Sequence, residues 1–484
     1  MKNKILLFFS IFIISVLIRL YYIGYESINP DAVNWHYRCQ QFANGIKYLQ
    51  LEKTYPHYHP GVTLCYIMTF PTEVYKQITN QVYNSTTYLT FNQVNSIFLV
   101  IVISFLVVLI SLQLGIRNGV IFGIILNLEP FFFGNSKLIH LDTLLTLFLF
   151  LSFLYFKKYL EEESLKYLLF VSLFLALAFL TKSVAIVFLP IFILGTFLLS
   201  NKSKIKKSLI LFGATVSFVY LLFPALWTSP VDTMVRIFKE ADRVGVRTGH
   251  SQIFLGEFYD ENEDPGILFY PVVMLIKFSP LMIFGIVLLF IDIFKFIETK
   301  ISIKKLLNFE VMMFLGYLVY FGIIIYSDKK IDRYLLVLFP PLFYYLTKKF
   351  NEYSKFIVGF LLVNLASIIY FSPYQFLYYS PVLLNYSNVN NLVAQKSFGV
   401  GIYDLKEYLL KNYGEKKLGF YDIKPMETMY PNSKVFDVRQ TSASKVDIVI
   451  LSVNEKLPEN YSNFYKKESF MIKGIPLYDV YLKN

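Results

Sequence analysis

Long apolar runs recur through most of the 484-residue chain, and they constrain its fold more than any other feature. Hydrophobic residues make up 55% of the sequence, which is more apolar surface than a soluble domain can bury. About eleven runs have the roughly 15 to 25 residues with which a helix crosses a bilayer. They lie at residues 5–25, 95–113, 118–134, 141–156, 167–181, 184–199, 208–226, 268–294, 308–326, 334–347 and 356–372. The sequence therefore predicts a polytopic α-helical protein of the lipid bilayer.

Lysine and arginine collect in every second connection between these runs. Short loops with such charge stay in the cytoplasm, so we predict a multi-pass protein of the cell membrane with a cytoplasmic N-terminus. The outer side then carries the first long loop, 26–94, and everything after residue 373. All five histidines fall on that side, so we expect the chemistry there: His36, His57, His59, His140 and His250. The formal net charge of +12 reflects the topogenic lysines, so we expect no nucleic-acid partner.

The character of the sequence changes after Pro373, where the apolar runs shorten to strand length. Residues 401–413 have the pattern of an amphipathic helix, and the segments KLGFYDI, KVDIVILSV and PLYDVYL have that of strands. We therefore expect a membrane domain, residues 1–372, followed by a small extracytoplasmic α/β domain, residues 373–484.

The first outer loop, 26–94, is too long for a simple connection. Apolar residues at helical spacing between Ala32 and Ile46, and again between Val62 and Val74, predict helices along the membrane surface. The loop also holds the only cysteines of the chain, Cys39 and Cys65. An oxidising compartment would permit a disulfide, but two free cysteines are equally compatible with the sequence.

Two carboxylates lie near predicted membrane boundaries on the outer side. Asp31 follows the first span, where a carboxylate can accept a proton from a hydroxyl whose reaction partner is held in the lipid. Asp142 opens the fourth span and could orient an acceptor or, with His140, bind a divalent metal. The structural alternatives are a solvated or helix-capping aspartate for Asp31 and a helix-dipole interaction for Asp142.

Cations are scarcer on the outer side and are therefore informative. Lys182 lies in a tight connection between two spans, Lys277 lies in the eighth run, and Arg333 precedes the tenth run. Together with His250 they could hold an anionic group such as phosphate at the interface. The alternative for each is a side chain that snorkels to lipid headgroups. Carboxylates, cations and a membrane surface together suggest group transfer from a lipid-linked phosphate to a hydroxyl or amine.

An ordered set of motifs runs along nearly the whole chain. Pro30-Asp31 followed by Trp35 is similar to a PDE…W motif, and His59-Pro60-Gly61-Val62-Thr63 is similar to HPGVT. Further segments are LDTLLTLF, LAFLTKS, FYPVVMLIKFSP, DRYLLVLFPPL, SPYQFLYYSPVL, GVGIYDLKEYLLKN and KGIPLYDVYL. With these motifs the chain resembles the lipid-carrier-dependent glycosyltransferases of the GT-C superfamily. It looks like relatives of the dolichyl-phosphate-mannose protein mannosyltransferases and of lipid A aminoarabinose transferase.

The resemblance implies a GT-C type fold, a polyprenyl-phosphate-linked sugar donor, catalysis on the outer face and inversion at the sugar carbon. It implies that Asp31 is the general base and that Asp142 is a second acidic residue near the acceptor. Lys182 and Arg333 match basic positions of the family and are expected to contact the donor phosphate. Ala32 departs from the pattern, because many relatives have an acidic residue there, but a single base suffices for inversion.

His59, His250 and Lys277 complete the substrate-binding candidates. The acceptor stays open among protein, lipid and glycan, and no cofactor is certain, although a divalent metal at His140 and Asp142 is compatible with the sequence. One alternative function is transport or flipping of lipid-linked saccharides. Transporters often show repeated halves and functional charges near the bilayer midplane, and neither is evident here. A second alternative is an inactive glycosyltransferase-like protein that serves assembly.

Overall fold

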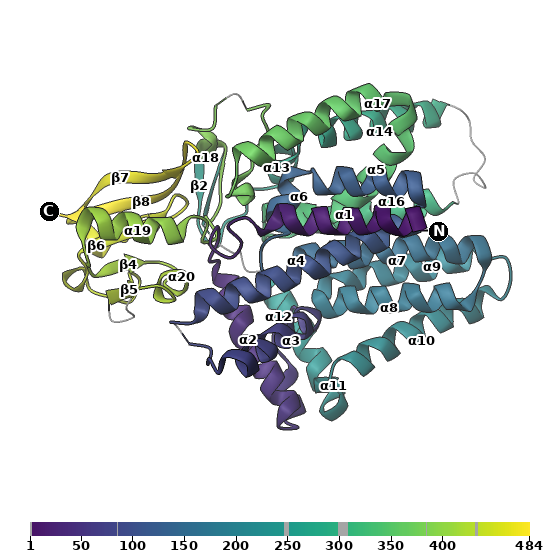
Figure 1. The fold of residues 1–484 in the computed structure, drawn as a ribbon, viewed down its shortest axis with the longest axis horizontal. Coiled ribbons are helices and arrows are strands. Elements are labelled where there is room, and N and C mark those ends of the chain that lie inside the picture. The colour runs from purple at the N-terminus through teal and green to yellow at the C-terminus, as the bar shows by residue number, and fades with distance from the viewer. Residues whose placement is uncertain (1, 85, 246–250, 299–307, 384, 431–433) are drawn as a thin grey trace.

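The computed structural model describes residues 2–84, 86–245, 251–298, 308–383, 385–430 and 434–484. Long helices lie side by side, and a sheet from the C-terminal part of the chain lies at one end of them (Figure 1). The helices are α1 (Lys2–Leu20), α2 (Pro30–Lys47), α3 (Val62–Thr79), α4 (Tyr88–Gln113), α5 (Ile116–Asn127), α6 (Pro130–Asn135), α7 (Asp142–Glu162), α8 (Leu165–Thr181), α9 (Phe188–Leu199), α10 (Lys204–Leu222), α11 (Ala225–Thr228), α12 (Pro230–Gly245), α13 (Phe269–Lys277), α14 (Pro280–Glu298), α16 (Phe309–Tyr326), α17 (Phe339–Tyr370), α18 (Val389–Leu392), α19 (Ile402–Tyr413) and α20 (Lys424–Glu427). Short 3-10 helices include η1 (Leu51–Thr54), η2 (Ser183–Val187) and η3 (Asp332–Leu338).

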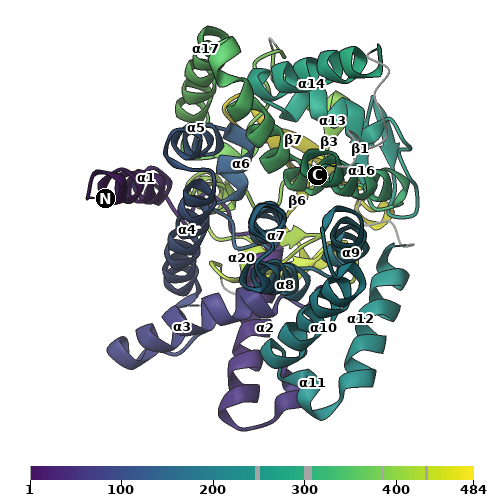
Figure 2. The same cartoon turned by 90° about the vertical axis from the view of Figure 1, so that its right-hand side faces the viewer.

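Within the described part of the chain, five helical stretches are long and apolar enough to cross a membrane. They are α4, α7, α10, α16 and the stretch Asp332–Tyr370, which contains η3 and α17. Shorter apolar helices lie at Leu6–Leu20, Ile116–Asn127, Leu165–Thr181 and Ser183–Leu199. Seen end on, α7 lies in the middle of the bundle (Figure 2), and 83% of its apolar window is buried, against 17% for α10. The polytopic helical architecture thus agrees with the apolar runs, while the number of about eleven spans stays a prediction.

Two of the predicted continuous spans are wrong in detail, because each is divided before a proline. The run 268–294 is split between α13 and α14 at the residues before Pro280, and the run 118–134 is split between α5 and α6 at Glu129, before Pro130. Proline has no backbone N–H, and it disfavours helical backbone in the preceding residue. A hydropathy profile alone shows neither of these helix breaks.

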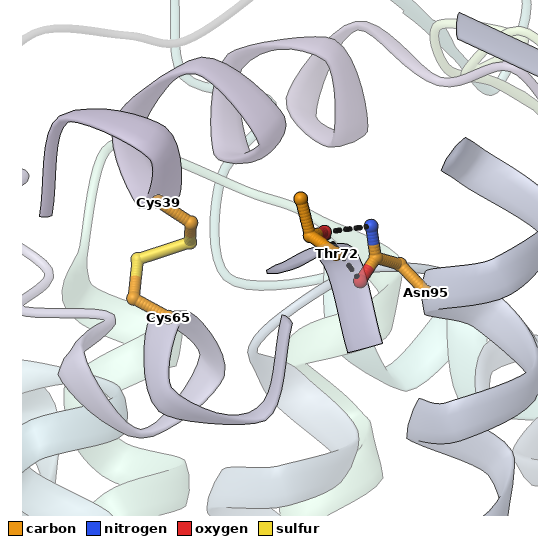
Figure 3. The surroundings of a disulfide bond; sticks show 4 residues. All are labelled: Cys39, Cys65, Thr72 and Asn95. Atoms are coloured by element: carbon orange, nitrogen blue, oxygen red, sulfur yellow. Dashed lines mark hydrogen bonds between the residues drawn. A yellow bond between two sulfur atoms is a disulfide. The ribbon is translucent and has the colours of Figure 1, made fainter. Parts of the chain in front are cut away.

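The two helices expected in the first outer loop are present as α2 and α3, and a disulfide joins them. Of the two states that the sequence allowed for Cys39 and Cys65, the structure contains the bonded one (Figure 3). Thr72 of α3 and Asn95 of α4 exchange hydrogen bonds of 2.9 and 3.1 Å in the same region. The outer helices are therefore fixed both to each other and to the bundle.

The C-terminal sheet has five strands in the order β5-β4-β6-β8-β7. The strands are β4 (Leu418–Phe420), β5 (Val435–Asp437), β6 (Ile448–Ser452), β7 (Phe464–Ile472) and β8 (Ile475–Lys483). β5, β4 and β6 are parallel, while β8 pairs antiparallel with both β6 and β7. β4, β6 and β8 lie in the segments predicted as strands. β5 and β7 lie outside the segments predicted as strands. β7 has the charged sequence FYKKESFMI, which is typical of a solvated edge strand.

Backbone pairing links the end of the bundle where α2 begins to the C-terminal region. β1 (Gln252–Phe254) pairs with β2 (Glu257–Tyr259) on one side and with β3 (Val393–Ala394) on the other. Ser27 forms an antiparallel bridge with Val400, and the Ile28 N–H donates to the Gly399 carbonyl at 3.1 Å. Gly399 has φ +69°, and a side chain there would lie 2.1 Å from the Ile28 carbonyl oxygen. These contacts hold the C-terminal region against the start of α2, where Asp31 lies.

Candidate active site

The candidate site is centred on two carboxylates that one histidine bridges. Asp31 lies in the first turn of α2, and Asp142 is the first residue of α7. His140 Nδ1 lies 2.9 Å from Asp142 Oδ2, and its Nε2 lies 3.2 Å from Asp31 Oδ2. Residues that are 111 positions apart in the sequence therefore share one histidine.

Two cations complete the cluster. Lys182 Nζ lies 2.6 Å from Asp142 Oδ1, so the lysine and this carboxylate form a buried ion pair. Arg333 bridges both carboxylates, with Nε 3.1 Å from Asp142 Oδ2 and Nη2 3.3 Å from Asp31 Oδ2. Five of the residues singled out in the sequence thus lie in one hydrogen-bonded group: Asp31, His140, Asp142, Lys182 and Arg333.

The start of α2 is capped by Asn29, whose side chain accepts from the Ala32 N–H. The interpretation of Asp31 as the capping residue is therefore wrong, although both aspartates still benefit from a helix N-terminus. Asp31 is 36% exposed, whereas the Asp142 side chain is only 3% exposed. Asp31 is therefore the carboxylate that a substrate can reach.

The HPGVT motif connects α2 to the segment that carries Lys182. The ring of Trp35 packs so closely on Gly61 that a side chain there would lie 2.2 Å from it. The Gly61 N–H donates to the Thr181 carbonyl at 3.1 Å, directly before Lys182. The Thr63 and Thr181 hydroxyls are 2.6 Å apart. Two motifs distant in sequence therefore fix Asp31 relative to Lys182.

The charge state of Asp31 follows from these neighbours. Burial alone would raise the pKa of its carboxyl, but the hydrogen bond and charge of His140 and the charge of Arg333 outweigh burial. They hold the pKa of Asp31 well below its usual range, so the group is ionised at neutral pH.

A polar cavity of about 250 Å³, here called the outer cavity, opens beside Asp31 and Arg333. Lys277, the predicted cation of the eighth run, also lines it. Its Nζ donates to the Tyr378 carbonyl at 3.0 Å and lies 3.5 Å from the centre of the Tyr379 ring. The opposite wall comes from the C-terminal region and includes Asn390, Gln395, Lys396, Asp422 and Lys424.

A second cavity of about 280 Å³, here called the apolar groove, is lined by another member of the cluster, Lys182. Lys182, Lys329 and His59 supply its polar end. Burial and the charges of Arg333 and Lys182 lower the pKa of Lys329 to about 8. The rest of the lining is mainly apolar and includes Val184, Ile186, Phe238, Ala241, Ile323 and Ile324.

His59 is placed at this polar end, with Nδ1 3.4 Å from the Ser183 hydroxyl. Burial and the charge of Lys182 hold the pKa of His59 well below its usual value, so the imidazole is neutral at neutral pH. It can therefore contribute a hydrogen bond to a ligand, but not a positive charge. His250, the other histidine candidate, lies outside the described residues.

Three residues near the cluster were not identified from the sequence. Lys329 lines the apolar groove, the Tyr334 ring centre lies 4.1 Å from Lys182 Nζ, and the Phe398 ring centre lies 4.3 Å from the Arg333 guanidinium carbon. The adjacent lysines in SDKK are a signal for Lys329, but their pattern does not indicate which of the two lysines faces the site.

The metal interpretation of His140 and Asp142 does not fit this geometry. Both ring nitrogens of His140 face carboxylates, and Asp142 is already paired with two cations. Across the ranges that the structure describes, no three His, Cys, Asp or Glu side chains are grouped to hold a metal ion.

Comparison with known proteins supports the resemblance seen in the motifs. Residues 79–227, which include Asp142 and Lys182, match the family model described as dolichyl-phosphate-mannose-protein mannosyltransferase. ArnT from Cupriavidus metallidurans bound to undecaprenyl phosphate is similar in fold, with a TM-score of 0.54 and 11% identity over 99% of this chain and 98% of that chain. Its apo state has a TM-score of 0.55 and 10% identity over the same shares.

A more distant likeness is to the Pmt1-Pmt2 protein O-mannosyltransferase of S. cerevisiae bound to the sugar donor. It has a TM-score of 0.34 and 16% identity over 52% of this chain and 39% of that chain. No curated protein matches the chain in sequence. The resemblance to GT-C glycosyltransferases is confirmed, and the end-to-end likeness to ArnT is one of fold.

Proposed function

We propose that this chain, which resembles GT-C glycosyltransferases, transfers a sugar from a polyprenyl-phosphate carrier to an acceptor on the outer face of the membrane. One observation carries the proposal: an apolar groove, lined by Lys182, and a polar cavity, lined by Asp31 and Arg333, both lie against one cluster of carboxylates and cations. A lipid-linked donor and a water-borne or surface-bound acceptor need two such chambers with one reaction centre between them.

The apolar groove suits the donor. Ile186, Phe238 and Ile323 offer an apolar path for the carrier chain, which leads to Lys182 and Lys329. Ammonium groups at that end would bind the phosphate and stabilise the charge that develops as it leaves. ArnT, whose fold is similar, has been crystallised with undecaprenyl phosphate, and we propose a carrier of this class here.

The outer cavity suits the acceptor. His140 and Arg333 both contact Oδ2 of Asp31, so Oδ1 is left for an acceptor hydroxyl or amine. In the proposed reaction, Asp31 takes the proton as the acceptor oxygen or nitrogen attacks the sugar carbon opposite the phosphate. One displacement of this kind inverts the configuration at that carbon. Asp142 fixes the two cations and His140 rather than touching the acceptor.

The C-terminal region would select the acceptor. Lys396 and Asp422 form an ion pair, and Lys424 donates to the Asn34 side chain at 2.6 Å, so α20 lies against α2 at the cavity wall. Residues 373–484, proposed as an extracytoplasmic domain, supply this wall but none of the four central charged side chains. Their contribution is therefore to recognition of the acceptor rather than to the chemical step.

The test is a transfer assay with purified protein and radiolabelled polyprenyl-phosphate hexoses and pentoses. We expect one sugar to leave the lipid and wild-type protein to depend on Asp31. Asp31→Asn keeps the shape but cannot take a proton, and removal of a general base costs about 10² to 10⁴ in rate. Asp437, at the end of β5, forms an ion pair with Arg439; Asp437→Asn is the matched control and should retain activity.

Two outcomes would contradict the proposal. If Asp31→Asn turned over at the wild-type rate while remaining monodisperse, Asp31 would be only a loop residue. If labelled sugar crossed sealed vesicles while still attached to its lipid, the chain would be a flippase, which is the main alternative.

A further inference from the structure

We propose that the donor carries an acidic sugar, of the uronic acid class, and that Arg38 binds the carboxylate of that sugar. This inference rests on the proposed transferase function and names the class of sugar that is transferred. The donor phosphate is expected beside Lys182 and the reacting sugar carbon beside Asp31. The sugar therefore has to lie along the surface that joins these two residues, and Arg38 belongs to that surface.

Aromatic rings connect the region of Lys182 to that of Asp31. Tyr58 lines the apolar groove together with Lys182, and its ring centre lies 4.0 Å from that of His57. The His57 ring in turn meets the Trp35 ring edge to face, with centres 6.1 Å apart. Trp35 lies four residues after Asp31 in α2, so both lie on one face of the helix. The expected phosphate position and the proposed base are thus joined by one packed row of rings.

Arg38 lies on the same face of α2, seven residues after Asp31. Side chains of a helix lean toward its N-terminus, and the Arg38 guanidinium carbon lies 4.8 Å from the centre of the Trp35 ring. The guanidinium is therefore held over Trp35, between its own backbone and Asp31 along the helix. The Arg38 side chain is half-buried, so a ligand can still reach it.

No carboxylate of the described residues forms an ion pair with Arg38. Lys182 is paired with Asp142, and Arg333 contacts both aspartates of the cluster. We expect Lys329, which lines the apolar groove, to bind the donor phosphate. A carboxylate on the sugar would give Arg38 a counterion, and the planar guanidinium offers two parallel N–H donors to such a group. A sugar with a positively charged amino group would be repelled at the same place.

His57 adds a hydrogen-bond donor without adding charge. Its Nδ1 accepts from the His59 N–H at 3.3 Å, so the hydrogen of the neutral imidazole is on Nε2. Burial and the charge of Arg38 lower the pKa of His57 to about 3, so the ring is neutral at neutral pH. The Nε2–H can donate to a sugar hydroxyl, while the charge that selects the sugar comes from Arg38.

The experiment extends the transfer assay, with full-length protein, to donors that share one polyprenyl phosphate. They carry hexuronic acids of the gluco, galacto and manno series, the matching neutral hexoses, or an amino pentose. We expect the highest kcat/KM for a uronic acid. Arg38→Gln should lower that kcat/KM by about 10- to 100-fold, the effect of one charge-assisted hydrogen bond, and leave the neutral hexoses unchanged. Arg38→Lys should lose less than Arg38→Gln.

Arg439→Gln is the matched control. The Arg439 guanidinium carbon also lies over an aromatic ring, 5.6 Å from the centre of Tyr421, but Arg439 lines neither the outer cavity nor the apolar groove. This variant should keep the wild-type preference among the sugars.

A binding measurement makes the test independent of the acceptor. The same donors compete with a fluorescent polyprenyl phosphate for Asp31→Asn protein, and the uronic acid donors should compete best. Equal or stronger binding and transfer of a neutral or amino sugar by the wild type would overturn the inference while the transferase function stands. If Arg38→Gln did not fold, this preference of protein with Arg38 intact would decide alone. Absence of transfer from every donor would instead refute the proposed function.

Discussion

Removal of Lys329 should weaken donor binding more cleanly than removal of any other cation of the cluster. Lys182 is paired with Asp142 at 2.6 Å and Arg333 bridges both aspartates, so deleting either removes one of the two cations that compensate the buried carboxylate of Asp142. Lys329 has no ion pair or hydrogen bond with another described residue, yet it lines the apolar groove. Its charge is therefore free for the donor phosphate.

The size of the effect follows from the contact it would make. Two unit charges about 4 Å apart at an effective dielectric constant of about 20 interact by roughly 4 kcal/mol, which is an upper limit. Net charge-assisted hydrogen bonds contribute about 1.5 to 3 kcal/mol. Lys329→Ala should therefore raise the dissociation constant of the donor by roughly 10- to 100-fold. Lys467→Ala, an exposed lysine on β7, is the control and should leave binding unchanged.

The charge of Lys329 determines in which direction kcat/KM for the donor changes with pH. The pKa of Lys329 is lowered to about 8, so the ammonium is present below pH 8 and is lost as the pH rises through that value. The proposed donor is a phosphodiester, whose single negative charge is constant in this range. kcat/KM for the donor should therefore fall above about pH 8 in the wild type. Lys329→Arg keeps its charge and should stay flat. Unchanged donor affinity in Lys329→Ala, or identical pH profiles for wild type and Lys329→Arg, would refute the reasoning.

Three further expectations concern topology, the disulfide and the phosphate contacts. A periplasm-active reporter fused after Lys329 or at Asn484 should be active and one fused after Lys204 inactive; reversed activities would invert the proposed orientation. Cys39→Ser should lower the free energy of unfolding by about 3 kcal/mol, measured by denaturation in detergent, and equal stability with and without reductant would contradict this. Arg333→Ala should reduce both donor affinity and maximal rate, because the phosphate charge is present in the donor and in the leaving group; an unchanged donor titration and rate would leave Arg333 a purely structural residue.

The sequence predicted those parts of the site that depend on position relative to the membrane. Asp31 and Asp142 were identified because each lies beside the end of an apolar run, and both do lie at helix starts in the cluster. Proline breaks at residues 130 and 280 were missed, since hydropathy counts apolar residues without regard to backbone donors. The positions of the charged residues in the sequence also do not indicate which of Lys329 and Lys330 has a free ammonium group. Packing separates them, because Lys330 is buried, contacts Asp264 at 3.4 Å and donates to the Ile325 carbonyl.

The backbone pairing of Ser27 and Ile28 with Gly399 and Val400 has a consequence for how the protein is made. A ribosome produces Asp31 early and the pairing segment, residues 399–400, only after the membrane helices. During synthesis the start of α2 therefore lacks its neighbour, and the wall with Phe398 over Arg333 is missing. In the proposed topology, the candidate site can close only after the chain beyond residue 400 has crossed to the outer side. A nascent or truncated chain would thus occupy the membrane without acting on its lipid carrier, and activity would appear only with completed translocation.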